Sequence, residues 1–229
     1  MNELGLSRAA AEALIGTAPA AVPWKPTLWP IVVGDREFIV KDVRRCRWIY
    51  RYTVGRWLLR REARIYAATR GLPFVPVCYG RLDRDALIFE RLRATPLSSF
   101  PEVHLRAEFF ERLAAALDQL HARSIAHMDL RHRSNIMVTA EGEPRLIDFE
   151  SSFDLGRRPL LRRIFWRLLR AVDRAGLIKW RLRYFPDHVS SEDRDWFARF
   201  ERWRRFWPAG RIWPPSFLRR RGKVRPTAT

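Results

Sequence analysis

Residues 126–150 constrain the fold most, because a polar loop there leads into two apolar runs joined by a Gly-containing turn. Two such runs separated by a short turn predict an antiparallel hairpin, with strands over residues 136–138 and 145–150. We expect this hairpin to present Asn135 and Asp148 at the same end. Amide and carboxylate oxygens suit a hard cation such as Mg²⁺, so the sequence predicts a metal site there.

A second hairpin is predicted over residues 30–41, where two β-rich runs are divided by a Gly-Asp pair. Lys41 ends its second strand. An amphipathic pattern over residues 55–70 predicts a helix, and Glu62 lies inside it. A carboxylate on a neighbouring helix can fix a lysine ammonium by an ion pair, so we expect Lys41 and Glu62 to act together.

The central third of the chain predicts a boundary between two lobes. Residues 75–79 and 86–89 are strand-like, and Glu90 follows the second of these runs. A Pro/Ser-rich linker then ends near Pro101, and residues 103–123 have the pattern of one long helix. We expect Glu90, at the start of the linker, to contribute to a nucleotide site.

Together these residues match the requirements of phosphoryl transfer from ATP, which needs oxygen ligands for Mg²⁺, a cation on the phosphates and a carboxylate near the attacking hydroxyl. Asn135 and Asp148 can supply the metal ligands. Asp129 can orient the hydroxyl. Lys41 can reach the phosphates if Glu62 fixes its ammonium.

The order of these motifs resembles the protein-kinase-like superfamily. Residues 127–129 (His-Met-Asp) are similar to its HRD motif, and Asn135 to its catalytic-loop asparagine. Residues 148–150 (Asp-Phe-Glu) are similar to its DFG motif. Lys41 looks like the ATP lysine, and Arg131 like the lysine that follows the catalytic Asp by two places and contacts the γ-phosphate.

This resemblance covers about residues 30–155 and implies an α+β, two-lobed protein-kinase-like fold that uses ATP and Mg²⁺. We expect a small β-rich N-lobe and a reduced helical C-lobe that carries basic amphipathic helices. The predicted segments are an N-terminal helix and lead-in (1–25), the N-lobe (26–92), the C-lobe (93–213) and a disordered basic tail (214–229).

Several departures from the family pattern indicate an atypical kinase. Gly34 is the only glycine between Pro26 and Lys41, so no Gly-rich loop can close over the phosphates. Asn135 follows Asp129 by six residues where the family has five. Met128 replaces the arginine that holds a phosphorylated activation loop, and no APE motif follows. A catalytically inactive pseudokinase that binds a membrane or a partner therefore stays open.

The substitutions resemble RIO-type atypical serine/threonine kinases and the bacterial lipopolysaccharide Kdo/heptose kinases. Residues 146–152 also resemble choline and aminoglycoside kinases, which place an acidic residue two positions after the metal-binding Asp. The hydroxyl acceptor can thus be a protein, a lipopolysaccharide core sugar or another small alcohol.

The net charge of +19 is concentrated late in the chain, with 21 Lys/Arg against 6 Asp/Glu in residues 156–229. From Pro159 onward, apolar residues form a helical stripe with arginines between them. This helix can pack on the C-lobe with a solvated basic face, or it can lie on an anionic membrane surface. Nucleic-acid binding is disfavoured because no recognition module accompanies the charge.

Location is predicted from the cysteines and the hydropathy. Cys46 and Cys78 lie in unrelated contexts, so they predict neither a disulfide framework nor a zinc site. No apolar stretch approaches the ~20 residues that a membrane-spanning helix needs. We expect a cytoplasmic protein, peripheral on the inner membrane face if the basic helix binds lipid.

Overall fold

The computed structural model describes residues 2–15 and 22–206, and the predicted tail (214–229) lies outside them. The described residues fall into two units that divide between Val189 and Ser190. This division separates the last described helix from the others that the sequence assigns to the C-lobe.

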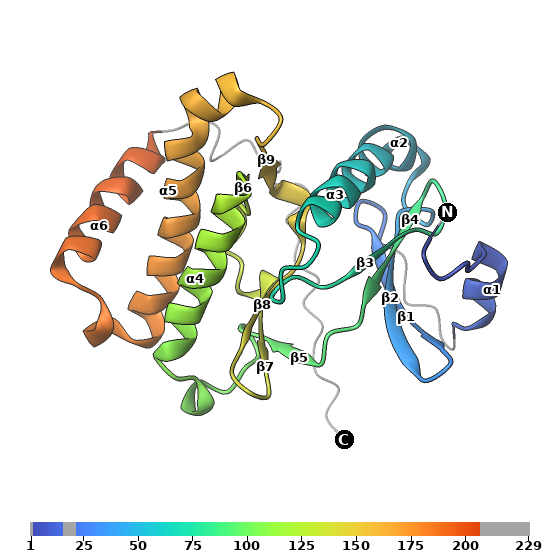
Figure 1. Ribbon diagram of the computed structural model, residues 1–229, viewed down its shortest axis with the longest axis horizontal. Helices are drawn as coiled ribbons and strands as arrows, with labels where there is room; N and C mark the ends of the chain where they lie inside the picture. The colour runs from blue at the N-terminus through green and yellow to red at the C-terminus, as the bar shows by residue number, and fades with distance from the viewer. Residues whose placement is uncertain (1, 16–21, 207–229) are drawn as a thin grey trace. The chain divides into compact units, whose positions relative to one another are not determined.

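The first unit begins with a four-stranded antiparallel sheet in the order β1-β2-β4-β3 (Figure 1). Its strands are β1 (Thr27–Val33), β2 (Arg36–Asp42), β3 (Cys78–Arg81) and β4 (Ala86–Glu90). The predicted hairpin is confirmed, with Val33 opposite Arg36 across a two-residue turn. The strand expected over 75–79 is wrong in position, because β3 begins at Cys78 and its register shifts between Cys78 and Gly80.

One face of this sheet is covered by α1 (Arg8–Ala13), whose first turn is capped by the Ser7 side chain. Ala11 is fully buried and packs in one cluster with Trp29, Phe38 and other sheet residues. Arg8 forms ion pairs with Asp42 and Asp83. The expected N-terminal helix is therefore present and packs on the sheet.

The opposite face of the sheet packs against a continuous helical segment. It consists of α2 (Trp48–Tyr50), a π-helical turn (Arg51–Gly55) and α3 (Arg56–Ala68). Side chains alternate along a strand, so Leu87 and Phe89 of β4 point away from the cluster under α1. They pack with Tyr66 of α3, as the amphipathic pattern predicts.

The rest of the first unit is mainly helical, with two small sheets in the orders β5-β7-β8 and β6-β9. Its elements are β5 (Ala94–Pro96), α4 (Glu108–Ala122), β6 (Ile125–Ala126), β7 (Ile136–Thr139), β8 (Pro144–Leu146), β9 (Phe153–Asp154) and α5 (Pro159–Tyr184). Short 3-10 turns span Glu102–His104, Arg133–Asn135, Phe149–Ser151 and Pro186–His188.

Two predicted elements in this part need correction. The helix expected over 103–123 begins only at Glu108, because a 3-10 turn and an extended Leu105 precede it. The strand expected over 145–150 ends at Leu146. Asp148 adopts a left-handed backbone (φ 63°), which no strand continues, and a 3-10 turn follows.

A shared hydrophobic core joins the strand-rich and helical parts of the first unit. The ring of Tyr66 from α3 lies 5.1 Å from that of Phe149, and 4.7 Å from that of Phe89 on β4. Leu113, Leu117 and Leu120 of α4 belong to the same cluster, on the face that their spacing predicts. The expected α+β fold, with a strand-rich part followed by a helical part, is confirmed.

The described part of the second unit is α6 (Ser191–Arg205), which the Ser190 side chain caps by accepting a hydrogen bond from Asp193 N at 3.1 Å. Within this helix the rings of Trp196 and Phe200 stack at 5.3 Å. Among the helices of residues 2–15 and 22–206, none is both long and apolar enough to cross a bilayer.

Candidate active site

The ammonium group of Lys41 lies among three carboxylates. Lys41 Nζ donates to Glu62 Oε1 at 3.0 Å and lies 2.8 Å from Glu62 Oε2. It also donates to Asp148 Oδ1 at 3.2 Å, and Glu150 Oε2 is 3.6 Å away. Strand β2, helix α3 and the segment after β8 thus meet at one cation, and the pairing of Lys41 with Glu62 expected from the sequence is present.

Burial and charge shape this cluster together. Desolvation lowers the pKa of Lys41, but the attraction of Glu62, Asp148 and Glu150 outweighs it and holds this pKa well above its ordinary value. Glu62 is 1% exposed, and desolvation raises its pKa to about 7 against the opposing pull of Lys41. Lys41 is therefore a cation throughout the physiological range.

Asp148 is the most accessible of the three carboxylates, with 41% of its side chain exposed. Desolvation raises its pKa, but the charge and hydrogen bond of Lys41 outweigh this effect, so the net shift is downward. A carboxylate that is both ionised and accessible can accept a cation. Asp148 is thus both ionised and accessible, and its backbone is left-handed.

The β7–β8 hairpin brings Asn135 and Asp148 to the same end. Ile136 pairs with Leu146, and Ile147 N then donates to the backbone oxygen of Asn135 at 3.1 Å. The residue next to Asp148 is thus bonded to Asn135 itself. The placement of these two side chains follows from the alternation of apolar residues and from the turn between the strands.

Asn135 also contacts Asp129 in the preceding loop. Its Nδ2 donates to Asp129 Oδ2 at 2.9 Å and to the Asp129 backbone oxygen at 3.2 Å. His132 Nδ1 lies 2.5 Å from Asp129 Oδ1, a contact that the sequence did not suggest. The amide nitrogen of Asn135 donates to Asp129, so Oδ1, which accepts from Ser134 Oγ at 3.3 Å, is the side-chain atom of Asn135 that could bind a cation.

Asp173 of α5 anchors the start of this loop, and sequence reasoning missed it. The residue is fully buried. Its carboxylate accepts from His127 N at 2.8 Å and from Met128 N at 2.7 Å, and His121 Nε2 lies 3.0 Å away. One signal was available, since Asp173 is the only acidic residue between Asp154 and Asp187.

The imidazole of His127 connects the loop to the strand end that carries Asp148. Its Nε2 donates to the backbone oxygen of Ile147 at 3.1 Å, while Nδ1 accepts from Asp129 N at 3.4 Å. The ring is fully buried and lies 4.8 Å from the ring of Phe149. His127 therefore positions the site without pointing into it.

Two further predicted residues have the following surroundings. Arg131 is partly buried in the loop, and its backbone oxygen accepts from Lys179 Nζ at 3.2 Å. Glu90 ends β4, where its carboxylate accepts from Val77 N at 3.0 Å. That hydrogen bond fixes the start of β3, and the cofactor role expected for Glu90 remains a prediction.

The oxygen atoms of Asn135 and Asp148 fit a hard divalent cation, because Mg²⁺ prefers carboxylate and amide oxygens and usually takes its other ligands from phosphates and water. In residues 2–15 and 22–206 no three His, Cys, Asp or Glu side chains are grouped as a protein-only metal site would require. The donor set thus matches a cation that is bound together with a phosphorylated ligand.

Comparison with known proteins bears on the fold. No family model and no curated protein sequence matches the chain. Among similar solved structures is the Rio2 kinase from Chaetomium thermophilum, in complex with ADP, Mg²⁺ and phosphoaspartate, with a TM-score of 0.57 and 17% sequence identity. The chain has a protein-kinase-like fold. The similarity covers 82% of this chain but only 63% of that kinase, so the chain spans less than two thirds of its length.

Within this kinase-like fold, the β1–β2 connection differs from a Gly-rich loop. It contains two residues, Gly34 and Asp35, and Gly34 has the positive φ (64°) that such a turn requires. The connection between β1 and β2 is therefore a tight turn and not a glycine-rich loop, as the sequence predicts.

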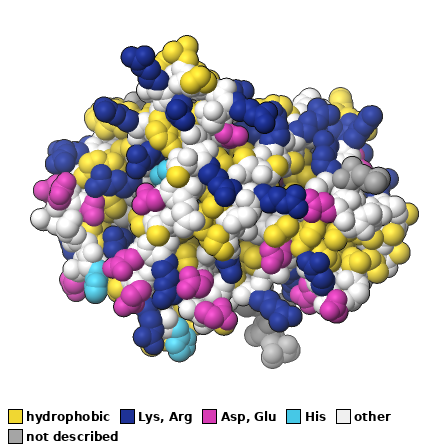
Figure 2. Space-filling view, in the orientation of Figure 1, with side chains coloured by type: hydrophobic (Ala, Val, Ile, Leu, Met, Phe, Trp, Pro, Cys, Tyr) yellow, Lys and Arg dark blue, Asp and Glu magenta, His cyan; other side chains and the backbone are white. Residues whose placement is uncertain are grey.

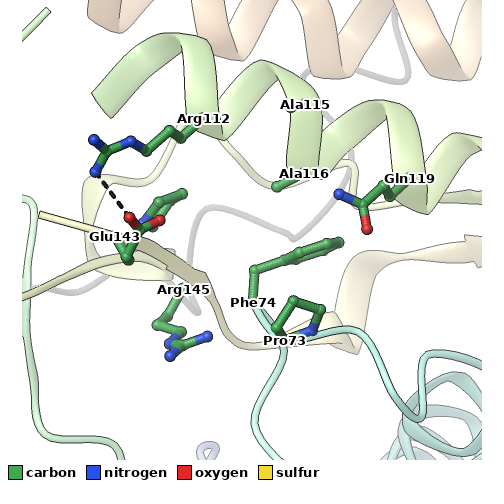
Figure 3. Close-up of a pocket in the computed structure, with 9 residues that line it drawn as sticks. Pro73, Phe74, Arg112, Ala115, Ala116, Gln119, Glu143 and Arg145 are labelled. Carbon is green, nitrogen blue, oxygen red and sulfur yellow. Dashed lines mark hydrogen bonds and ion pairs between the residues drawn. The ribbon is translucent and has the colours of Figure 1, made fainter. Parts of the chain in front are cut away.

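The kinase-like fold also has an open cavity of about 400 Å³ away from the residues above (Figure 3). Phe74 and Pro73 face α4 across it, and the Arg112–Glu143 ion pair (2.8 Å) closes one side. None of the predicted site residues lines this cavity. The candidate active site is therefore defined by its charged side chains and not by this hollow.

Proposed function

We propose that this protein is a kinase that transfers the γ-phosphoryl group of ATP to a hydroxyl acceptor with the aid of Mg²⁺. One observation carries the proposal: the Lys41 ammonium bridges Glu62 and Asp148, and the same hairpin end bears Asn135 bonded to Asp129. These residues could supply the groups that phosphoryl transfer requires, namely oxygen ligands for Mg²⁺, a cation on the phosphates and a carboxylate near the attacking hydroxyl, on a fold of the kinase type.

Lys41, Glu62 and Asp148 would bind the nucleotide. Glu62 holds the ammonium from the buried side, which leaves Lys41 oriented toward Asp148 and any phosphate bound there. Lys41 with Asp148, Glu150 and Glu62 carries a net charge of −2 when Glu62, whose pKa is about 7, is ionised, and −1 when it is protonated, in a protein of net charge +19. This local negative charge favours a divalent cation over a free phosphate.

Bound to Asn135 Oδ1 and the Asp148 carboxylate, Mg²⁺ would neutralise charge on the phosphates. Asp129 would orient the acceptor hydroxyl through the carboxylate that Asn135 now holds from one side. His132, 61% exposed at its side chain, can move away and free Asp129 Oδ1 for that hydroxyl. Arg131, two residues farther on, would contact the transferred phosphoryl group.

The acceptor is better matched by a small or lipid-linked alcohol than by a peptide. Ten residues separate Asp148 from Pro159, where α5 begins, and β9 occupies part of them. This segment is too short for both an activation loop and a peptide platform. We therefore favour a lipopolysaccharide core sugar as the acceptor, and a protein serine or threonine is the alternative. We propose that the enzyme acts in the cytoplasm.

The test is transfer of radiolabel from [γ-³²P]ATP to lipopolysaccharide acceptors and, separately, to protein acceptors. Lys41→Met, Asp129→Asn and Asp148→Asn should each lower the rate by about 100-fold or more, because each removes a group that acts in the transition state. Lys25→Met and Asp118→Asn are matched controls, since both side chains are exposed elsewhere in the first unit.

Label in the glycolipid alone would exclude the protein-kinase alternative, and label in protein alone would exclude the favoured acceptor. A pseudokinase that serves only as a binding module is the remaining alternative, motivated by the two-residue β1–β2 turn. Wild-type protein that neither transfers label nor hydrolyses Mg·ATP faster than Asp148→Asn would overturn the enzyme proposal.

A further inference from the structure

The exposed large apolar side chains of the first unit are unevenly distributed. Two segments, residues 48–57 and 153–165, contain most of them. These side chains are Trp48, Ile49, Tyr52, Val54, Trp57, Phe153, Leu160, Leu161, Ile164 and Phe165, with exposed fractions from 37% to 70%. Soluble proteins rarely expose such groups contiguously unless the surface binds a partner or a membrane.

The two segments meet at Arg61. Its guanidinium lies 5.7 Å from the ring centre of Trp57 and 4.9 Å from that of Phe153. Arg61 also donates to the backbone oxygen of Glu150 at 2.5 Å. The apolar side chains of α2, α3 and β9 therefore belong to one surface, and that surface borders the residue that follows Asp148 and Phe149.

The first half of α5, which follows β9 closely in the chain, adds further exposed apolar side chains. Leu160 and Ile164, and likewise Leu161 and Phe165, are spaced one helical turn apart, and every residue from 156 to 165 is exposed. Burial begins only at Leu169 and includes Asp173 and residues 175–178. The amphipathic stripe thus serves two purposes, since its second half packs in the core and its first half faces solvent.

Both segments lie in strongly basic stretches, and Asp154 is the only acidic residue within residues 48–57 and 153–165. Residues 43–61 contain seven arginines, residues 156–172 contain six, and neither stretch contains an Asp or Glu. Figure 2 shows hydrophobic and basic side chains along the upper edge of the molecule, where Figure 1 places α2 and the start of α5. Arginine binds phosphate through its planar fork of donors, whereas aromatic rings favour the interfacial zone of a bilayer.

We propose that this surface, formed by residues 48–57, Phe153 and residues 156–170, docks the protein on an anionic lipid bilayer. The exposed aliphatic and aromatic side chains enter the headgroup boundary, and the arginines pair with lipid phosphates. A nucleic acid would pair with the arginines but would leave Leu160 and Ile164 in unfavourable polar surroundings. If the proposed kinase activity also holds, the acceptor lies at the membrane surface beside Asp148.

The test is co-sedimentation of the full chain with vesicles of phosphatidylcholine alone and of phosphatidylcholine mixed with phosphatidylglycerol. We expect binding to the mixed vesicles, weakened about ten-fold or more by Leu160→Gln/Ile164→Gln and by Arg163→Gln/Arg167→Gln. Leu28→Gln/Val32→Gln on β1 and Arg91→Gln/Arg93→Gln before β5 are matched controls that should bind like wild type.

Three results would overturn the proposal. Equal binding by wild type and Leu160→Gln/Ile164→Gln would place the contact elsewhere. A dimer in sedimentation velocity without lipid, lost in that variant, would show that a second copy covers the surface. RNA binding tighter than vesicle binding, with the same loss in the variant, would assign it to nucleic acid. Asp148→Asn should bind vesicles normally, so failure of the kinase proposal is distinguishable from failure of this one.

Discussion

At the residue scale, Asp173 links a long helix to the candidate catalytic loop. Its carboxylate accepts hydrogen bonds from two consecutive loop amides, and none of its surface is exposed. Buried amides that lose their acceptor cost free energy, because no water replaces the lost partner. The loop that carries Asp129 therefore depends on a residue more than 40 positions away in the sequence.

Replacing Asp173 should consequently affect both stability and turnover. We expect Asp173→Ala to lower the free energy of unfolding by about 3 kcal/mol, because one buried amide, one partly buried amide and the His121 imidazole lose their partner. Asp173→Asn should retain one acceptor but place an amide group against a loop N–H. In the folded fraction, kcat should fall more than the KM for ATP rises, because Lys41 and Glu62 are untouched. Unchanged kcat in a folded variant would contradict this role.

Asp85 makes stability depend on pH in the acid range. Its buried carboxylate receives hydrogen bonds from Arg56 (2.7 Å) and Arg51 (2.5 Å). Desolvation raises the pKa of Asp85, but these bonds outweigh it, so the folded pKa lies well below the ordinary value near 4. The interactions of ionised Asp85 with Arg51 and Arg56 therefore stabilise the protein above about pH 4, and this stabilisation is lost as the pH falls further.

Asp85→Asn should lower the melting temperature at pH 7 by roughly 4 °C and reduce the dependence of stability on pH below about 4. Thermal melts of wild type and variant between pH 7 and pH 3 would measure both effects. Asp118→Asn is the control, because Asp118 is exposed. Parallel pH curves for wild type and Asp85→Asn would show that Asp85 does not carry the acid dependence.

At the scale of elements, α5 lies close against the candidate catalytic loop, and one glycine permits the approach. A Cβ on Gly176 would lie 2.8 Å from Leu130 Cβ and 3.3 Å from the Leu130 carbonyl carbon. Trp180, one turn later, donates from Nε1 to the backbone oxygen of Leu130 at 2.7 Å. The helix therefore supports Asp129 through its neighbour as well as through Asp173.

Gly176→Ala separates helix propensity from packing. Alanine favours a helix by about 1 kcal/mol over glycine, whereas forcing α5 away from Leu130 should cost about 1–3 kcal/mol. We expect a net decrease in the free energy of unfolding, measured by urea denaturation. Arg170→Ala, at an exposed position of the same helix, should change it by less than about 0.5 kcal/mol. A stabilised Gly176→Ala protein would contradict the close approach.

Local patterns predicted the elements that hold the candidate site, and long-range contacts limited the rest. The hairpins were predictable because their turns and alternation lie within short windows, and Glu62 followed from the 3.6-residue period. The predicted strand over 75–79 was placed too early because Val75, its apolar first residue, packs in the core and does not pair with β4. The pairing of β3 itself is irregular between Cys78 and Gly80. Asp173 was missed because an Asp within an arginine-rich helix also fits a solvated face.

At the scale of the whole molecule, the candidate site carries a net negative charge in a strongly basic protein. Lys41, Glu62, Asp148 and Glu150 sum to −2 when ionised, whereas the chain carries +19. The same core cluster contains Phe89 of the four-stranded sheet and Phe149 next to Asp148. A ligand that contacts both Lys41 on β2 and Asp148 after β8 would therefore stabilise both parts of the first unit.

This coupling leads to a measurable prediction for nucleotide binding. A ligand that binds only the native state at about 100 times its Kd adds about 2.7 kcal/mol, which corresponds to roughly 5–10 °C for a chain of this size. We expect Mg·ATP to raise the melting temperature by this order, and ATP with EDTA to raise it much less, because the net negative charge at Lys41 repels uncomplexed phosphates. Asp148→Asn should abolish the difference between the two conditions, while Asp118→Asn should preserve it. Equal shifts with and without Mg²⁺ in the wild type would mean that Asn135 and Asp148 do not hold the cation.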